Sequence, residues 1–292
     1  MFNFKSYEKA NSVQEAVELL QKKPDAKLVA GGTDVLIKLH KGKAQFHHFV
    51  DIHDIGELNY IRMSDNGDLV IGSGTCFTSV AESTLINSHI PVLATAIRTI
   101  GGPQVRNMAT VGGNLCNGVP SADSASPLIC LNAVLTIEGA DGGRQMPLEA
   151  FFISPGKVAL KQHEILTAIT ITRENWDGYY GHFYKYAMRE AMDIATIGCA
   201  AVCKLDEDVL QDLRLAYGTA APVPIRCKVA EKKAHGRKIS PELLADIAAA
   251  VVNDVAPRTS WRAEKEFRLQ IIKTLAERVV KQAIHHAGGT IQ

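Results

Sequence analysis

The amino-acid sequence predicts a protein of mixed α+β class that is divided into two domains. The chain has 292 residues, and at roughly 150 residues per domain such a length predicts about two domains. In the first half, segments with helix and strand patterns are interspersed, whereas the second half places strands first and helices after them, as an α+β domain does. A short polar and aromatic segment at 176–181, which contains two glycines, is the predicted boundary.

The composition excludes several classes of protein. Lys and Arg number 32 and Asp and Glu 31, a net charge of +1, which argues against a nucleic-acid-binding protein. Hydrophobic residues make up 46% and charged residues 22%, which is enough apolar surface for sizeable cores and too much for a disordered chain. No apolar run approaches the ~18 residues that span a bilayer, and the N-terminus lacks the apolar region of a secretory signal. We therefore expect a cytoplasmic protein with no membrane association and with its six cysteines as free, mostly buried thiols.

The first predicted domain begins with a helix over 12–21. Ser12 can cap this helix, and Glu15 three residues later completes a capping box. Asn66-Gly67 between two apolar segments predicts a β-hairpin. The other elements expected here are strands at 27–30, 48–52, 134–138 and 164–172 and helices at 78–87 and 91–99. In the 164–172 strand, one face is expected to carry Ile165, Thr167, Ile169 and Ile171.

The second predicted domain contains strands followed by two helices. The strands are expected at 182–189, 195–204 and 213–218. Ser240 and Pro241 suit the cap and first turn of the first helix. The last helix is expected to bury a stripe formed by Phe267, Ile271, Leu275 and Val279.

Two glycine-containing segments carry the functional signal. In the first, KLVAGGTDVL at 27–36, a strand runs into Gly31-Gly32. Glycines let a ligand approach the backbone closely, and clustered N–H groups bind anions, phosphate above all. The second, at 100–128, has two further Gly-Gly pairs and no periodicity. A loop of this length inside a domain is usually functional or disordered, and the regular structure on both sides favours function.

Together the two segments predict a pair of loops that grip one phosphate-containing ligand, although either Gly-Gly pair alone could be a simple turn. Thr110, Asn114 and Asn117 can hydrogen-bond a polar, sugar-like chain. Neither segment matches the Rossmann or P-loop glycine pattern, and no hydrolase, zinc-protease or kinase signature is present.

VAGGTDVL followed by RNMATVGGNLCNGVPSADSASPL closely resembles the FAD-binding subunits of molybdenum hydroxylases, and EILTAITI, FYKYAMREAMDIATIGCA and SWRAEKEFRLQII extend the resemblance over nearly the whole chain. It implies a two-part FAD-binding domain of the vanillyl-alcohol-oxidase (PCMH) type over 1–176, with subdomains at about 1–55 and 56–176. A smaller α+β domain of the CO dehydrogenase flavoprotein type would follow at 182–289. Phe267 stands where the family has a tyrosine, the family's proline after the 169–172 strand end is missing, and there is no cysteine-rich insertion for an extra iron–sulfur cluster.

The resemblance also implies roles for individual residues. The FAD diphosphate and adjoining groups would be held, mainly through backbone amides, by Lys27, Leu28, Val29, Ala30, Gly31, Gly32, Thr33 and Asp34. A second clamp would be formed by Ala109, Thr110, Val111, Gly112 and Gly113. Asn114 and Asp123 would lie close to the cofactor. The backbone of Ile165 and Leu166 would meet its adenine end, and Tyr184 and Lys185 would lie near the flavin edge.

The function that the resemblance implies is electron transfer within a complex. A partner subunit with molybdopterin would oxidise the substrate, xanthine or hypoxanthine, and [2Fe–2S] clusters on another partner would pass electrons to the FAD of this chain and so to NAD+. Hydride transfer from a flavin requires no protein nucleophile, which agrees with the lack of a visible catalytic group. Two alternatives stay open: the FAD subunit of a sister complex that oxidises carbon monoxide, nicotinate or an aldehyde, and a module that binds a nucleotide without redox turnover.

Overall fold

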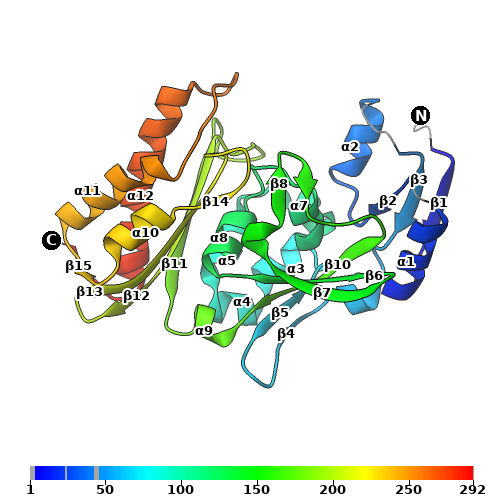
Figure 1. Ribbon diagram of the computed structural model, residues 1–292, viewed down its shortest axis with the longest axis horizontal. Coiled ribbons are helices and arrows are strands. Elements are labelled where there is room, and N and C mark those ends of the chain that lie inside the picture. The colour runs from blue at the N-terminus through cyan, green and yellow to red at the C-terminus, as the bar shows by residue number, and fades with distance from the viewer. Residues whose placement is uncertain (1–3, 24, 43–45, 292) are drawn as a thin grey trace.

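The computed structural model describes residues 4–23, 25–42 and 46–291. Figure 1 shows three regions side by side along the long axis, each built on its own β-sheet. The N-terminal region lies at the right, the central region in the middle and the C-terminal region at the left. None of the helices in these described ranges combines the length and apolar character that a bilayer span requires.

The N-terminal region is a small parallel sheet covered by one helix. Its strands follow the order β1-β3-β2, and the elements are β1 (Ser6–Lys9), α1 (Val13–Lys22), β2 (Ala26–Val29), α2 (Val35–His40) and β3 (His48–Asp51). Ser12 caps α1 as predicted, because its hydroxyl accepts the Glu15 N–H at 3.0 Å. The predicted capping box is displaced by one residue, since the Glu15 carboxylate accepts the N–H of Asn11 at 2.8 Å and not that of Ser12.

The central region is a five-stranded antiparallel sheet with helices against it. The strand order is β4-β5-β10-β6-β7, formed by β4 (Ile61–Met63), β5 (Leu69–Gly72), β6 (Val134–Gly139), β7 (Gly142–Pro147) and β10 (Glu164–Ile171). The predicted Asn66-Gly67 hairpin is present as β4-β5, and a second hairpin joins β6 and β7. The remaining elements are η1 (Gly56–Leu58), α3 (Phe77–Glu82), α4 (Thr84–His89), α5 (Pro91–Arg98), α6 (Pro103–Met108), α7 (Val111–Cys116), α8 (Ala125–Cys130), η2 (Leu148–Ala150), β8 (Phe152–Ser154), β9 (Lys157–Val158) and α9 (Arg173–Trp176).

Two predictions for the helices of this region were wrong. The 100–127 segment, expected as an irregular loop, contains α6, α7 and the start of α8. Each of these helices has six residues, too few turns for a helical periodicity to emerge from the sequence. The helix expected at 78–87 is interrupted at Ser83, which ends α3 and caps α4.

The alternation predicted for β10 was also wrong, because a β-bulge between Leu166 and Ala168 shifts its register against β6. A bulge inserts one residue and exchanges the two faces of the strand beyond it. Ile165 therefore packs in the N-terminal core, whereas Leu166 shares the central core with Ile169 and Ile171. Strand β10 thus contributes side chains to both the N-terminal and the central core.

The C-terminal region is a second antiparallel sheet with helices on one face. Its elements are β11 (Tyr180–Tyr186), β12 (Ile197–Asp206), β13 (Val209–Gly218), β14 (Ile225–Arg226), α10 (Lys228–Ala234), β15 (Arg237–Lys238), α11 (Pro241–Ala250), η3 (Val251–Asn253) and α12 (Lys265–His286). The short helix α10 was not predicted. Phe267 is exposed, contrary to the expected stripe, whereas Ile271, Leu275 and Val279 are buried.

The β11-β12-β13 sheet buries both of its faces. Phe183, Ala200 and Val202 pack into the central core, while the alternate positions face α11 and α12 in the C-terminal core. All six cysteines are free, and four of them, Cys130, Cys199, Cys203 and Cys227, are buried, as expected.

Arg214 links the central and C-terminal regions. Its buried guanidinium, carried by β13, donates to the Asn175 side-chain oxygen at 2.9 Å, the Tyr179 hydroxyl at 2.7 Å and the Asp212 carboxylate at 3.0 Å. Removing a buried charged donor leaves its partly buried partners without these hydrogen bonds.

We therefore expect Arg214→Met to lower the free energy of unfolding by about 2–3 kcal/mol in urea denaturation. The matched control is Arg173→Met, because Arg173 is 63% exposed and pairs with Asp177 at 3.0 Å. Exposed pairs contribute little, so this change should cost less than about 0.5 kcal/mol. Equal losses for the two variants would contradict the role given to Arg214.

Candidate functional site

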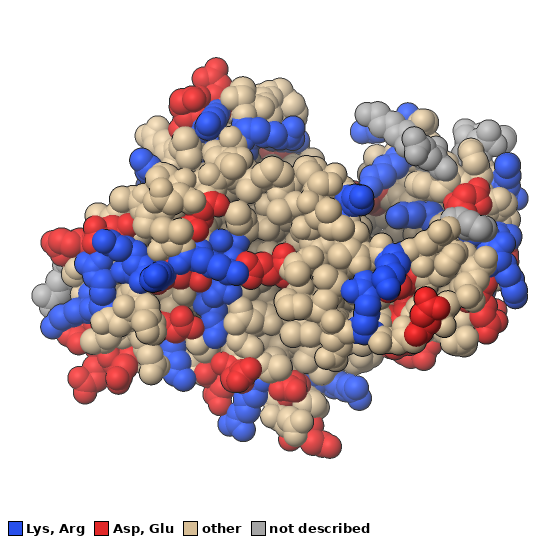
Figure 2. Space-filling view, in the orientation of Figure 1, with Lys and Arg blue, Asp and Glu red and all other residues tan. Residues whose placement is uncertain are grey.

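A cavity of about 600 Å³ lies between the N-terminal and central regions, within the ~300–1,000 Å³ usual for small-molecule sites. It is lined by β2 and the loop after it, by Ser73 and Gly74, by the 109–117 segment and by residues 156–166. In Figure 2, blue Lys and Arg side chains gather along the junction between the N-terminal lobe at the right and the rest of the molecule.

The first glycine loop contacts the second glycine segment directly. A Cβ atom on Gly31 would lie 1.6 Å from the carbonyl oxygen of Met108, the last residue of α6, so only glycine fits there. Gly32 has φ +72°, a left-handed conformation that favours glycine. In the part of the chain that the structure describes, the backbone N–H groups of residues 31–34 donate no hydrogen bond. Such a run of unpaired N–H groups suits an anion.

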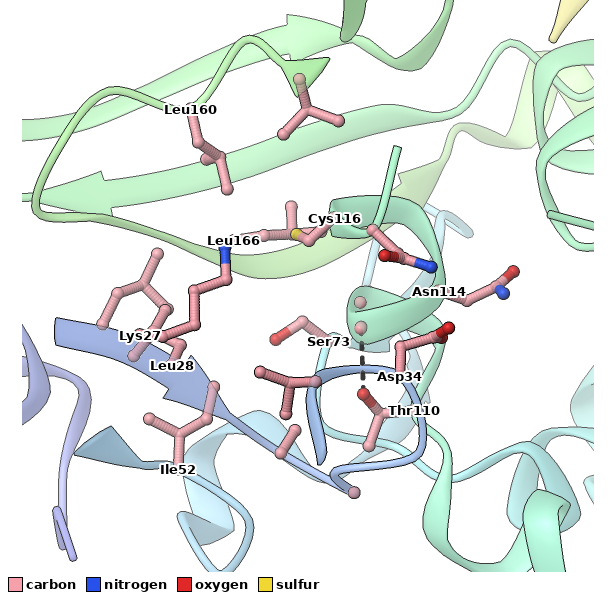
Figure 3. A pocket seen from close by; sticks show the side chains of 18 of the residues that line it. Lys27, Leu28, Asp34, Ile52, Ser73, Thr110, Asn114, Cys116, Leu160 and Leu166 are labelled. Carbon is pink, nitrogen blue, oxygen red and sulfur yellow. Dashed lines mark hydrogen bonds between the residues drawn. The ribbon is translucent and has the colours of Figure 1, made fainter. Parts of the chain in front are cut away.

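The second glycine segment differs, because its amides are already used. The N–H groups of Val111 and Gly112 donate to the carbonyls of Thr75 and Ser73 at 3.1 and 2.9 Å. The N–H of Gly113 donates to the Thr110 hydroxyl at 3.0 Å, the dashed line in Figure 3. An added Cβ on Gly113 would lie 2.9 Å from that hydroxyl oxygen, so the hydroxyl would have to shift. This segment therefore lines the cavity with glycine backbone and does not offer a set of free amides.

The cavity has an apolar end and a polar end. Figure 3 shows Lys27, Leu28 and Ile52 on one side of the apolar end and Leu160 and Leu166 opposite them. At the polar end lie the side chains of Ser73, Thr110, Asp34 and Asn114. The Asn114 side-chain oxygen accepts a hydrogen bond from Ser124 at 2.7 Å, which leaves its amide NH₂ as a donor.

The charges around the cavity are mainly positive. Four lysines line it, whereas Asp34 and Glu164 are the acidic lining residues, and Glu164 is neutralised by Arg144 at 2.7 Å. The lysines are Lys27, Lys38, Lys157 and Lys161. Lys38 of α2 donates to the side-chain oxygen of Asn117 at 2.6 Å and so bridges the two sides. A positive surround favours an anionic ligand.

Five of the predicted site residues do not line the cavity. Val29 and Val111 are buried in the core. Tyr184 is exposed, and Lys185 lies on the same strand in a buried ion pair with Asp123 at 2.8 Å. The other predicted site residues line the cavity: Lys27, Leu28, Ala30, Gly31, Gly32, Thr33, Asp34, Ala109, Thr110, Gly112, Gly113, Asn114, Ile165 and Leu166.

The Lys185–Asp123 pair adjoins the cavity wall. The Lys185 ammonium also donates to the carbonyl of Thr99 at 3.0 Å, next to the lining residue Ile100. The second carboxylate oxygen of Asp123 is buried without a hydrogen-bond partner, a state that calls for an explanation in a native protein. Burial raises the pKa of Asp123 to about 6, and Lys185 opposes that rise.

Sequence reasoning missed two parts of the lining. One is Ser73-Gly74, at the end of β5, and the other is the 156–163 stretch around β9. A signal existed for the first, since Gly72-Ser73-Gly74 is a further small-residue cluster after a strand. Among the described residues, no group of three or more His, Cys, Asp or Glu side chains could hold a metal ion.

Comparison with known protein families gives two matches in chain order. Residues 2–173 match the FAD binding domain in molybdopterin dehydrogenase. Residues 182–283 match the CO dehydrogenase flavoprotein C-terminal domain.

Individual proteins resemble the chain over its whole length. It is 47% identical over 292 residues to the xanthine dehydrogenase FAD-binding subunit of Escherichia coli O157:H7, covering 100% of both chains. It is 32% identical to the glyceraldehyde dehydrogenase medium chain of Sulfolobus acidocaldarius, covering 95% of this chain and 97% of the other. A structure of carbon monoxide dehydrogenase from Hydrogenophaga pseudoflava superposes with a TM-score of 0.93 at 29% identity, covering 98% of this chain and 99% of that one.

These matches confirm the resemblance found in the sequence and the mixed helix-and-sheet architecture that it implies, with an FAD-binding part followed by a flavoprotein C-terminal part. The chain belongs to the family of FAD-binding subunits of molybdenum hydroxylases.

Proposed function

We propose that the chain is the FAD-binding electron-transfer subunit of a xanthine dehydrogenase, acting in the cytoplasm. A molybdopterin subunit would oxidise xanthine or hypoxanthine, a [2Fe–2S] subunit would deliver the electrons to the FAD of this chain, and NAD+ would accept them. The observation that carries the proposal is the 47% identity over the full length to a protein of that name.

The chemistry of the cavity lining suits FAD. When bound, FAD supplies the two-electron redox chemistry of the subunit. The unpaired N–H groups of residues 31–34 would hold the diphosphate, helped by the surrounding lysines. Gly113 lines the cavity without a side chain, which would let the cofactor lie against the backbone. Ile165 and Leu166 at the apolar end would enclose the adenine.

The Lys185–Asp123 pair would lie near the flavin edge and adjust the reduction potential of the flavin. A cation close to the flavin ring favours the reduced, anionic form. Asp123 and the Thr99 carbonyl fix the Lys185 ammonium in place. In this proposal the side chains of the protein orient the cofactor and set its potential, and none of them reacts.

A sister complex is the second candidate, because other relatives act on different substrates. Identities of 32%, 30% and 32% connect the chain to medium chains or FAD subunits named for glyceraldehyde, carbon monoxide and nicotinate dehydrogenases.

The test is anaerobic reduction of the complex purified from its native host through a tag on this chain. Bleaching of the flavin absorbance by xanthine, followed by its recovery on addition of NAD+, would support the proposal. Bleaching only by another of these substrates would move the chain to a sister complex, and recovery only with another oxidant would refute NAD+ as acceptor. A bound flavin that no substrate reduces would favour a module that binds the nucleotide without redox turnover.

Gly113→Val should abolish FAD retention while the chain stays folded, because the branched side chain would project from backbone that lines the cavity. FAD content would be read from the absorbance of the purified protein, and folding from circular dichroism. Gly143→Val is the matched control, since Gly143 lies in β7 with no atom closer than 3.7 Å to an added Cβ. Gly32 is unsuitable because its φ of +72° would strain any substitution. Full flavin absorbance in Gly113→Val would contradict the placement of the cofactor.

The Lys185–Asp123 pair should also make the reduction potential of the flavin depend on pH. Because the pKa of Asp123 is raised to about 6, Asp123 is protonated below that pH, and the pair changes from neutral to one net positive charge. We expect the reduction potential of the wild-type protein to rise, relative to that of Asp123→Asn, as the pH falls through about 6. Redox titration of both FAD-loaded proteins measures this difference. A constant difference between about pH 5 and about pH 7, roughly one unit on each side of the pKa, would show that the pair does not lie near the flavin.

A further inference from the structure

A buried serine stands behind the polar end of the cavity. Ser124, directly before α8, is 0% exposed and is not among the residues that line the cavity. A serine in this position usually accepts an N–H group of the first helical turn, but the Ser124 side chain makes no such bond. Its hydroxyl donates instead to the side-chain oxygen of Asn114 at 2.7 Å, and Asn114 on α7 does line the cavity.

This hydrogen bond determines which end of the Asn114 amide faces the cavity. An asparagine side chain carries an accepting oxygen and a donating NH₂ group, and rotation about its last torsion exchanges the two. If the amide turned, Ser124 would accept from the NH₂ group and its own hydrogen would be left over, because its side chain makes no other hydrogen bond among the described residues. An unpaired buried donor is costly, so the oxygen stays on Ser124 and the NH₂ group points away from it.

The NH₂ group of Asn114 is a free donor. Figure 3 shows Asn114 at the polar end of the cavity, together with Asp34 and Thr110. Asn114 is partly exposed, and its NH₂ group donates no hydrogen bond within the part of the chain that the structure describes. The oxygens of a phosphate or of a flavin carbonyl accept hydrogen bonds and do not donate them. An NH₂ group directed into the cavity suits such an oxygen, whereas an amide oxygen would repel it.

The backbone at Ser124 is held in place independently of this bond. The preceding residue, Asp123, forms a buried ion pair with Lys185 at 2.8 Å, and all six residues of α8 are buried. Loss of the Ser124 hydroxyl should therefore leave this segment folded and release only the Asn114 amide.

We propose that Ser124 is a positioning residue for FAD, because its hydroxyl holds the Asn114 amide with the NH₂ group ready to donate to an acceptor oxygen of the cofactor. Ser124 itself does not touch FAD. The proposal rests on the proposed function, in which FAD occupies this cavity. The benefit is preorganisation, since an amide that is already fixed in its donating orientation loses less side-chain freedom when the cofactor binds.

The test measures the affinity for FAD of the complex purified through a tag on this chain. The FAD is removed and titrated back while flavin fluorescence is followed. We expect Ser124→Ala to raise the dissociation constant about fivefold, which is the order of the effect of fixing one side chain. Ser126→Ala is the matched control, because Ser126 lies on α8, is 1% exposed and has a hydroxyl without a hydrogen-bond partner in the described structure. The control should bind FAD as the wild type does.

A double-mutant cycle separates positioning from packing. Asn114→Ala alone should raise the dissociation constant about tenfold, since it removes a hydrogen bond to the cofactor. In that background no amide is left to position, so the addition of Ser124→Ala should change nothing further. A fivefold loss there as well would show that Ser124 acts by packing, and would overturn the proposal. Wild-type affinity in Ser124→Ala, or an equal loss in Ser126→Ala, would overturn it too.

Asn114→Asp tests the orientation of the amide without altering the buried serine. The new carboxylate keeps an oxygen for the Ser124 hydroxyl but presents a second oxygen where the NH₂ group was. We expect this variant to bind FAD more weakly than Asn114→Ala does. Affinity equal to or higher than that of Asn114→Ala would mean that the NH₂ group does not donate to the cofactor, which contradicts the proposal. A wild-type complex that takes up no FAD would instead refute the proposed function.

Discussion

The arrangement of the site depends on the close approach of the Met108 carbonyl oxygen to Gly31. Any side chain at position 31 would collide with that oxygen, so the loop after β2 and the end of α6 can meet only because residue 31 is glycine. This contact joins the N-terminal and central regions beside the cavity, which Gly31 lines. The cavity exists because two sheets, built from distant parts of the chain, are held together at this point and along β10.

The two glycine segments meet but contribute differently to the cavity. Within the described residues, the backbone N–H groups of residues 31–34 donate no hydrogen bond, which is costly unless water or a ligand accepts them. The N–H groups of residues 111–113 donate hydrogen bonds to Thr75, Ser73 and Thr110. The first segment is therefore suited to bind charge, and the second to present a rigid surface without side chains. Similar Gly-Gly pairs in the sequence thus have separate physical roles.

Much of this arrangement could be predicted from the sequence. The Asn66-Gly67 hairpin and the caps at Ser12 and Ser240 are local signals, and the structure confirms all three. The helices within 100–127 could not be recognised, because six-residue helices leave no period. The bulge in β10 could not be predicted either, since it depends on pairing with β6. The Lys185–Asp123 contact joins residues 62 positions apart, and nothing in the sequence around either residue indicates that it is made.

In the proposed FAD complex, the 31–34 backbone binds the diphosphate and the 111–113 backbone does not. Amide hydrogen exchange, compared between the FAD-free and the FAD-loaded protein, distinguishes the two segments. We expect the amides of residues 31–34 to exchange fast without FAD and to become protected when it binds, while those of residues 111–113 are protected in both states. Unchanged exchange at residues 31–34, or new protection mainly at residues 111–113, would contradict it.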